Sequence, residues 1–285
     1  MTAPPSPAHD RYDPQAAADA LRDWLASHRR VFVLTGAGIS TASGIPHYRG
    51  EDGQWQRKPP VTYQAFVGEA ATRARYWARS FVGWPWFARA LPNAGHAALS
   101  RWQARGGLSR LLTQNVDGLH QRAGSTQVID LHGRLDEAVC LDCGARRSRA
   151  ALQAELAANN PDWTALSARS APDGDADLEG VRFEDFVPPR CEVCAGLLKP
   201  DVVFFGENVP RARVAAAHEA LQASDAMLVV GSSLMVYSGY RFARAAREAG
   251  LPLALLNRGV TRADDIATLK LEADCAATLE TALGA

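Results

Sequence analysis

Four short apolar runs, each followed directly by small or polar residues, constrain the fold of this chain more than any other feature. The runs are Val31–Leu34, Leu108–Leu112, Met227–Val230 and Leu253–Leu256. Each has the length of a buried strand, and a helical stretch, Tyr240–Ala249, separates the last two. Strands that alternate with helices form parallel sheets whose carboxyl edge carries ligand-binding loops. The pattern predicts an α/β fold with a doubly wound parallel sheet; an ordinary α/β domain with plain turns remains the alternative.

Two further segments depart from this pattern. Residues 50–92 are rich in Trp and Tyr, and residues 139–199 hold cysteine pairs, a helical stretch (Ala150–Ala158) and a polar loop. We interpret both as insertions that build a smaller helical and metal-binding domain. The predicted division is a sheet domain of residues 14–48, 93–135 and 200–285, a small domain of residues 49–92 and 136–199, and a disordered lead of residues 1–13. Asp13 and Pro14 are suited to begin a helix directly after that lead.

Two Cys-x2-Cys pairs use four of the five cysteines: Cys140 with Cys143, and Cys191 with Cys194. Each pair can place two thiolates on one ion, and two pairs complete the tetrahedral sulfur shell that suits zinc. Because this ligand set leaves no position for water, we predict one structural Zn²⁺; chance pairs or two redox dithiols are the alternative. Cys275 stands apart, and a lone cysteine is more often a small buried residue than a nucleophile.

A glycine-rich turn, residues 35–50, follows the first apolar run. Gly36 and Gly38 would let the backbone approach a pyrophosphate. The dinucleotide-binding fingerprint requires glycine at its sixth position, where this chain has Thr41. The motif alone therefore leaves a nucleotide site and a tight turn equally open. Arg49, later in the turn, can meet a carboxylate, a phosphate or solvent.

A second polar loop, TQNVDGLH at residues 113–120, follows the second run. A chain reversal needs only the backbone tolerance of Asn, Asp or Gly. Gln114 and His120 are not needed for that purpose, so the loop raises the question of a site. His132 lies nearby in LHGR (131–134), and by itself it is typical of a core histidine bonded to a backbone carbonyl.

Charge and hydropathy exclude several classes of protein. Lys+Arg and Asp+Glu both total 31, so the formal net charge is zero, which argues against nucleic acid as the main partner. No apolar run reaches the roughly 18–20 residues of a membrane helix, so no membrane partner is expected. The start, MTAPPSPAHDRYD, lacks the basic and apolar regions of a signal peptide. We expect a cytoplasmic protein whose thiols stay reduced.

The motifs occur together and in order. They are GAGISTASGIPHYR, TQNVDGLH, LHGR, the two cysteine pairs, KPDVVFFGE (199–207), VGSSLMVYS (230–238) and LNRG (256–259). From about residue 30 to 280, the chain resembles the sirtuins, which are NAD-dependent protein deacylases. YWARSFVGWP (76–85), APDGD (171–175) and VYSGYRF (236–242) are similar to the class II branch, which includes the mitochondrial type-4 sirtuin of animals. The resemblance implies a Rossmann-like large domain and a smaller zinc-binding domain, with NAD⁺ and acyl-lysine meeting in the cleft between them.

The resemblance also implies roles for individual residues. His132 matches the general base, and Asn115 and Asp117 complete the catalytic set, with Asp117 expected at the nicotinamide carboxamide. The implied NAD⁺ contacts are Gly36, Ala37, Gly38, Thr41, His47, Tyr48, Arg49, Gln114, Asn115, Val116, Asp117, Gly231, Ser232, Ser233, Asn257, Arg258, Gly259 and Cys275. His120 is expected to support the loop rather than to react.

The KPDVVFFGE segment is expected to border the peptide groove. As an extended segment it would pair with a substrate backbone as an added strand. Val202, Phe204 and Phe205 would supply apolar walls for the lysine stem, although plain core packing is the alternative for one of the two phenylalanines.

His47 departs from the common family pattern, and Tyr76 with Arg79 matches one subgroup of the family. The family usually has Asp where this chain has His47, a change that bears on NAD⁺ affinity; we still expect activity because Arg49 and His132 are intact. Tyr76 and Arg79 are similar to a pair that binds the acyl carboxylate in desuccinylase-type sirtuins, a task suited to a guanidinium. The alternative is an ordinary pair on an aromatic-rich helix.

The expected function is transfer of the acyl group from acyl-lysine to ADP-ribose with release of nicotinamide. In this chemistry the amide oxygen attacks the nicotinamide ribose, and His132 then removes a proton from a ribose hydroxyl. Two alternatives remain: a protein mono-ADP-ribosyltransferase, and a non-enzymatic NAD-sensing module.

Overall fold

The computed structural model describes residues 13–54, 60–166, 176, 178 and 181–284. The predicted disordered lead, apart from Asp13, and the APDGD motif lie outside the described residues. Asp13 caps the first helix as expected: its carboxylate accepts a hydrogen bond from the backbone N–H of Gln15 (3.4 Å), and Pro14 occupies the first helical position.

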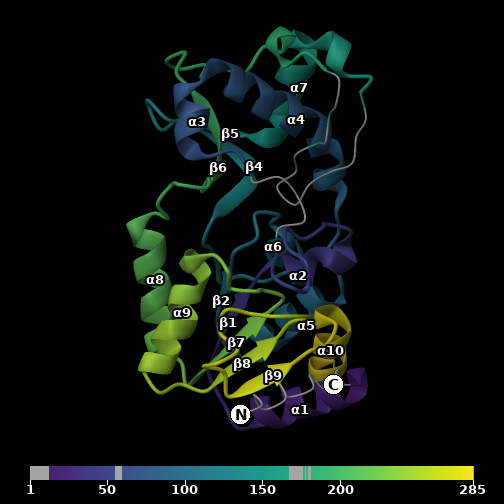
Figure 1. Cartoon of the computed structure of the whole chain (residues 1–285), viewed down its shortest axis with the longest axis vertical. Helices are drawn as coiled ribbons and strands as arrows, with labels where there is room; N and C mark the ends of the chain where they lie inside the picture. Colours follow the sequence, from purple (N-terminus) through teal and green to yellow (C-terminus); the bar gives the residue numbers. More distant parts are fainter. Residues whose placement is uncertain (1–12, 55–59, 167–175, 177, 179–180, 285) are drawn as a thin grey trace, which may run out of the picture.

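A six-stranded parallel sheet forms one half of the molecule (Figure 1). Its strand order is β3-β2-β1-β7-β8-β9, and every neighbouring pair is parallel. The strands are β1 (Val31–Thr35), β2 (Leu108–Thr113), β3 (Val128–Asp130), β7 (Ala226–Val230), β8 (Leu253–Leu256) and β9 (Leu269–Leu271). The predicted doubly wound sheet is confirmed, with its order reversing between β1 and β7. The sequence pattern missed β3 and β9, because three-residue strands give no periodic signal.

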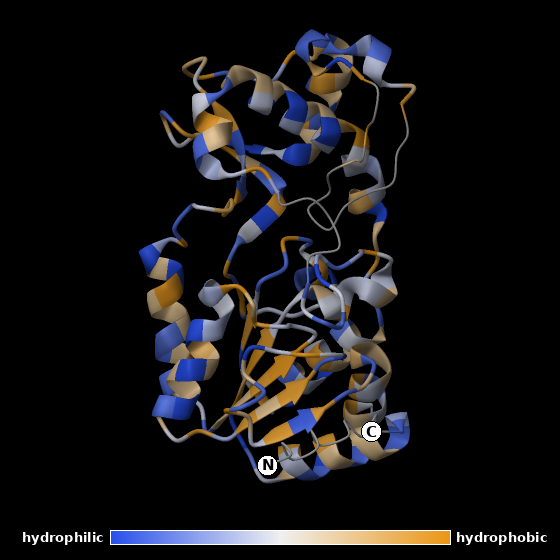
Figure 2. Ribbon diagram, viewed as in Figure 1, coloured by the Kyte–Doolittle hydropathy of each residue, from blue (hydrophilic) through white to orange (hydrophobic). Residues whose placement is uncertain are grey.

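Helices cover both faces of this sheet. Along β1, Val31 and Val33 join the apolar core of one face, whereas Phe32 and Leu34 join the core of the other. The first face packs α1 (Pro14–Ala26), α5 (Ala94–Ala104) and α10 (Cys275–Leu283), and the second packs α8 (Arg211–Gln222) and α9 (Tyr237–Glu248). Strands β7 and β8 are therefore apolar throughout and β1 is apolar up to Thr35, while the outer helix faces are polar (Figure 2).

A three-stranded antiparallel sheet forms the core of the other half (Figure 1). Its strands, in the order β5-β4-β6, are β4 (Gly133–Cys140), β5 (Arg146–Ser148) and β6 (Leu198–Val202). The surrounding helices are α3 (Tyr63–Gly68), α4 (Ala70–Arg89) and α7 (Arg149–Asn159). Phe66, Trp77 and Leu152 are buried in the apolar cluster between sheet and helices. The exact boundaries of the two predicted domains stay a prediction.

The remaining elements are short. They are α2 (Ala37–Ser40), α6 (Leu119–Arg122) and the 3₁₀ turns η1 (Thr41–Ser43), η2 (Pro161–Trp163) and η3 (Phe183–Asp185). Within the described ranges, no helix combines the length and apolar character that crossing a membrane requires.

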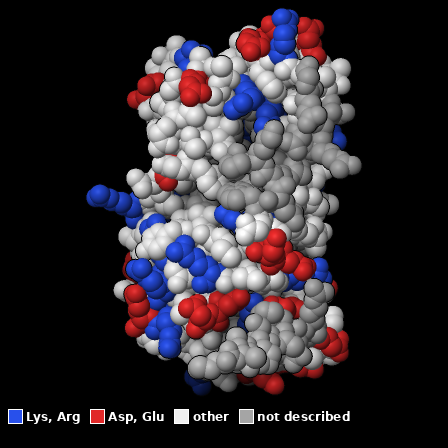
Figure 3. All heavy atoms as spheres, in the orientation of Figure 1, with Lys and Arg blue, Asp and Glu red and all other residues white. Residues whose placement is uncertain are grey.

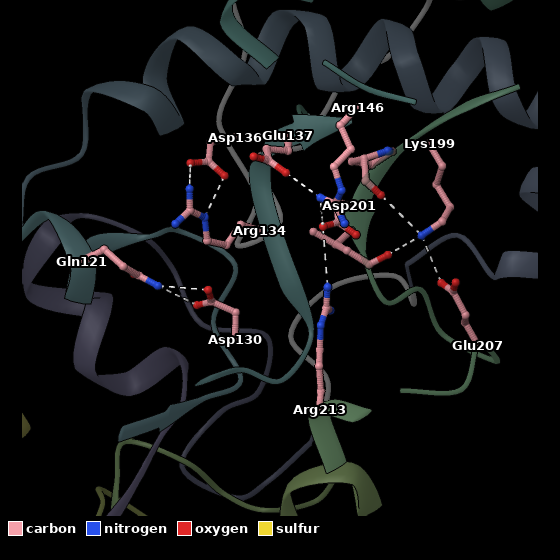
Figure 4. A network of polar contacts seen from close by, with 12 residues as sticks. Gln121, Asp130, Arg134, Asp136, Glu137, Arg146, Lys199, Asp201, Glu207 and Arg213 are labelled. Atoms are coloured by element: carbon pink, nitrogen blue, oxygen red, sulfur yellow. Dashed lines mark hydrogen bonds and ion pairs between the residues drawn. The ribbon is translucent and has the colours of Figure 1, made fainter. Parts of the chain in front are cut away.

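Charged side chains of both signs lie side by side on the visible face (Figure 3). One such group joins the two halves: Asp201 of β6 accepts from Arg146 of β5 (2.7 Å) and pairs with Arg213 of α8 (3.5 Å) (Figure 4). These side chains are partly exposed, so each pair contributes only about 0–1 kcal/mol. The network therefore links the two halves but contributes little to stability.

Leu112→Ala tests the assignment of β2 to the centre of the core. Leu112 is fully buried, so its truncation is expected to lower the free energy of unfolding by about 2–5 kcal/mol. Leu91→Ala, at a position 68% exposed, is the control and is expected to change it by less than about 0.5 kcal/mol. Chemical denaturation measures both, and equal effects would contradict the assignment.

Candidate active site at the sheet edge

A cavity of about 530 Å³ lies at the carboxyl edge of the six-stranded sheet. It gathers loops that follow β1, β2, β7 and β8, together with the segment that follows β6. Among the described residues it contains every predicted NAD⁺ contact except Gly259, along with His132, Tyr76, Val202, Phe204 and Phe205. The site residues predicted from separate motifs therefore meet in one space.

The glycine-rich turn serves the packing of two loops. Gly36 N–H donates to Val230 O (3.0 Å), and Gly38 N–H donates to Gly231 O (2.8 Å). A Cβ on Gly38 would lie 2.7 Å from the Cα of Gly231, and Gly231 itself has a φ of +61°. Glycine is thus required here by the contact between the β1 and β7 loops, independently of any ligand.

Asn115 and Asp117 are held by Ser40, which the sequence analysis did not single out. The Ser40 hydroxyl donates to Asp117 Oδ2 (2.7 Å), and Asn115 Nδ2 donates to Ser40 Oγ (3.0 Å). Asn115 Nδ2 also donates to Gly36 O (3.0 Å), and the N–H of Leu119 donates to Asp117 Oδ1 (2.9 Å). Burial raises the pKa of Asp117, although these donors oppose the shift. Ser40 thereby joins the β1 turn to the β2 loop.

His132 faces the cavity and is held at both ring nitrogens. Nδ1 lies 2.9 Å from the backbone oxygen of Gln114, and Nε2 lies 2.8 Å from Ser238 Oγ. Burial lowers the pKa of His132, the hydrogen bond to the Gln114 backbone opposes this shift, and the positive charges of Arg213 and Arg241 add to it. The imidazole is therefore neutral at physiological pH. It bonds to a backbone carbonyl, as a core histidine does, and also lines the cavity.

His120 lies beneath the loop and does not line the cavity. Its Nε2 is 2.9 Å from Thr35 Oγ1, and its ring centroid lies 4.8 Å from that of His96, with the two rings tilted by 57°. Burial lowers the pKa of both histidines, that of His96 to about 4. This placement fits the expected supporting role.

The two phenylalanines predicted to contact the lysine stem differ in burial. Phe204 is buried, with ring centroids of Phe66 and Tyr76 each 5.1 Å away, whereas Phe205 is 36% exposed. Both line the cavity with Val202. Phe204 therefore packs in the core and also lines the cavity, and Phe205 is the more exposed of the two.

A buried lysine shapes the turn that follows these walls. Lys199 Nζ donates to Glu207 Oε2 (3.1 Å) and to the backbone oxygen of Val202, and it lies 4.8 Å from the ring of Phe204. The Glu207 carboxylate also accepts from the N–H of Phe204 (2.8 Å). These contacts hold residues 204–207 as one side of the cavity.

Arg79 and Gly259 are the predicted contacts outside the cavity lining. Tyr76 faces the cavity from α4, but Arg79 Nε donates to Ala176 O (2.7 Å). The two residues are three positions apart on the helix, and only one of them faces the lined space. Gly259 has a φ of +80°, and a Cβ there would lie 2.1 Å from the backbone oxygen of Glu51. It is a packing glycine.

The four paired cysteines converge in the small half of the molecule. Their Sγ atoms all lie within 4.8 Å of one another, with Cys140–Cys194 and Cys143–Cys191 separations of 3.6 Å. Four thiolates around one ion with Zn–S bonds of about 2.3 Å require spacings of this size. None of the four lines the cavity. The group is compatible with a structural zinc ion and leaves the reaction to the sheet edge.

Cys275 lies apart from the other cysteines, as expected. It is buried, its Sγ faces Leu256 O at 3.6 Å, and burial raises its pKa to about 12. A thiol in that state is not a nucleophile at neutral pH.

Comparisons with known proteins agree on one family. The Sir2 family profile matches residues 36–238. An NAD-dependent protein deacetylase of Xanthomonas axonopodis pv. citri is 60% identical over 273 residues, which cover 96% of this chain and 91% of that protein. The mitochondrial NAD-dependent protein lipoamidase sirtuin-4 of Bos taurus is 48% identical, covering 95% of this chain and 86% of that protein.

Solved structures support the same assignment. A structure of Sir2 with a p53 peptide and NAD⁺ superposes with a TM-score of 0.69 at 30% identity and covers 92% of this chain and 95% of that one. A structure of Sir2 bound to acetylated peptide gives a TM-score of 0.70 at 29% identity, with the same coverage.

Removal of one thiolate tests the metal site. Cys143→Ala is expected to abolish stoichiometric zinc binding and to lower Tm by about 5–10 °C, because an incomplete shell no longer links the two cysteine pairs. Cys275→Ala is the control and is expected to keep its zinc. Elemental analysis and thermal unfolding measure both. Full zinc content in Cys143→Ala would contradict the four-sulfur assignment.

Proposed function

The chain belongs to the Sir2 family and is an NAD-dependent protein deacylase, and from this premise we propose the role of each side chain in the cavity. The observation that carries the proposal is the shared cavity: the predicted dinucleotide contacts, His132 and the apolar walls all line it. A base, a cofactor site and a lysine channel are needed together for acyl transfer to ADP-ribose.

The residues at the strand ends fit a dinucleotide. Asn115 and Asp117, fixed by Ser40, would hold the nicotinamide and its ribose. Ser232 and Asn257, at the ends of β7 and β8, would hold the adenosine half along the same edge. The remaining cofactor contacts are Gly36, Ala37, Gly38, Thr41, His47, Tyr48, Arg49, Gln114, Val116, Gly231, Ser233, Arg258 and Cys275. Bound NAD⁺ supplies the ribose carbon attacked by the acyl oxygen and the hydroxyl that afterwards receives the acyl group.

His132 acts as the general base for that hydroxyl. Its pKa is lowered by burial, so its neutral form, which alone accepts a proton, persists at physiological pH. The contact between Nδ1 and the Gln114 carbonyl directs Nε2 into the cavity. The proton of the hydroxyl passes to Nε2 and yields an imidazolium.

The substrate is an acylated lysine of a protein or peptide. Val202, Phe204 and Phe205 form the apolar side of the cavity, suited to the methylene stem of lysine. Tyr76 closes the same side from α4. His47 lines the cavity where the family usually carries Asp, and we expect activity with His47 in place. A cytoplasmic location stays a prediction.

Product analysis of wild type and His132→Ala tests the function. Wild type is expected to release nicotinamide, deacylated peptide and O-acyl-ADP-ribose, identified by mass spectrometry. His132→Ala is expected to lose about 10²–10⁴-fold in rate because the base is gone. His28→Ala, two residues after α1 and far from the cavity lining, is the control and should retain the wild-type rate. ADP-ribose left on a protein would establish a mono-ADP-ribosyltransferase instead, and nicotinamide release that ignores both acyl peptide and His132 would reject the deacylase mechanism.

The pH dependence of kcat/KM follows from the shifted base. Burial lowers the pKa of His132 from 6.5, so the ring stays neutral below pH 6.5 and is protonated only at still lower pH. The acidic limb of the profile is therefore expected below pH 6.5. A limb centred above that value would contradict a buried base.

Arg79→Met tests the hypothesis that an acidic acyl group is bound. Because Arg79 lies outside the cavity lining, the ratio of succinyl-lysine to acetyl-lysine turnover is expected to change by less than about twofold. A selective fall of about tenfold or more in succinyl turnover would establish Arg79 as a carboxylate ligand. Tyr76→Phe serves as the matched variant on the same helix.

A further inference from the structure

Ser238 meets the proposed base from a distant part of the chain. It lies in the first turn of α9, and its Oγ is 2.8 Å from His132 Nε2. Both residues line the cavity.

The partner at the opposite nitrogen determines the direction of this hydrogen bond. The backbone oxygen of Gln114, 2.9 Å from Nδ1, can only accept, so Nδ1 carries the proton of the neutral ring. Nε2 then presents its lone pair, and the Ser238 hydroxyl donates to it. Ser238 thus engages the nitrogen that must receive the substrate proton.

The next residue fits α9 against the same pair. A Cβ on Gly239 would lie 2.3 Å from the side-chain oxygen of Gln114, so the glycine lets the two segments approach closely with the Gln114 side chain in this position. The first turn of α9 therefore contacts Gln114 and His132 together. The N-terminal end of a helix also carries partial positive charge, which favours a neutral imidazole beside it.

The charged groups that act on His132 come from two helices. Arg213 of α8 and Arg241 of α9 both oppose its protonation. They would remain in any variant of Ser238, so an effect of that variant reports on the hydroxyl.

We propose that Ser238 is a positioning residue for the general base: its hydroxyl holds His132 Nε2 toward the cavity as an acceptor and yields that nitrogen to the substrate hydroxyl in the reacting complex. The proposal rests on the function proposed for His132. Without the Ser238 hydroxyl the ring is held at Nδ1 alone, and its neutral form loses a donor that stabilises it. The base then becomes easier to protonate and less well directed.

Ser238→Ala and Ser238→Thr in the full chain test this role. Deacylation of an acetyl-lysine peptide is measured from about pH 5.5 to 9, together with nicotinamide exchange, which reports on the step that precedes proton removal by His132. For Ser238→Ala we expect the acidic limb of kcat/KM to move to higher pH, with a loss of about tenfold near pH 6 and a return to within about threefold of wild type near pH 8.5. The rate of nicotinamide exchange and the KM values for NAD⁺ and for the peptide should change by less than about twofold. Ser238→Thr keeps the hydroxyl and should keep the wild-type limb.

An unchanged acidic limb of the kcat/KM profile in Ser238→Ala would overturn the proposal. A uniform loss of activity at every pH in both Ser238→Ala and Ser238→Thr would also overturn it. Nitrogen NMR of wild type provides a test that does not depend on the folding of a variant: proton on Nδ1 is expected, and proton on Nε2 of the neutral ring would overturn the assignment. Retained deacylation in His132→Ala would instead reject the proposed function. An inactive His132→Ala beside an unshifted Ser238→Ala would reject the role of Ser238 alone.

Discussion

Parallel pairing of β1 with β2 and β7 is the constraint on which the site depends. Parallel strands end at one edge, so the loops after Thr35, Thr113 and Val230 are brought together by backbone hydrogen bonds alone. Side chains then join these loops, as Gln114 Nε2 does when it donates to Ser232 Oγ (2.6 Å). A polar site on three loops can be rigid in this arrangement because each loop begins at a buried strand.

His132 lies where the chain leaves the large sheet for the small one. β4 begins at the next residue, Gly133, and the N–H of Val203, just after β6, donates to His132 O (2.8 Å). The proposed base is thereby fixed to the segment that carries the proposed lysine channel. The backbone pairing of β4 with β6 holds this junction, and the partly exposed ion pairs of Asp201 lie on β6 beside it.

Burial shifts the pKa values of Asp117 and His132 in opposite directions, and in both residues it favours the uncharged form. Desolvation penalises the charged form, so it raises the pKa of Asp117 and lowers that of His132. The supporting His96 and His120 are shifted downward for the same reason. An uncharged imidazole suits proton removal, and hydrogen bonds such as those from Ser40 keep the Asp117 side chain oriented whatever its charge.

The sequence by itself determined the four longer strands of the parallel sheet and the paired cysteines, because strand burial and metal-ligand chemistry are recorded locally in residue type and spacing. Its family motifs pointed to a little over half of the residues that line the cavity. It did not reveal β3 and β9, which are too short for a periodic signal and exist through pairing with neighbours. Nor did it separate Tyr76 from Arg79, because the direction of a helical side chain depends on what the helix packs against. Only the tertiary structure decided that Ser40 supports Asp117 and that Ser238 meets His132. Such contacts join segments far apart in the chain, and no local pattern encodes a distance across space.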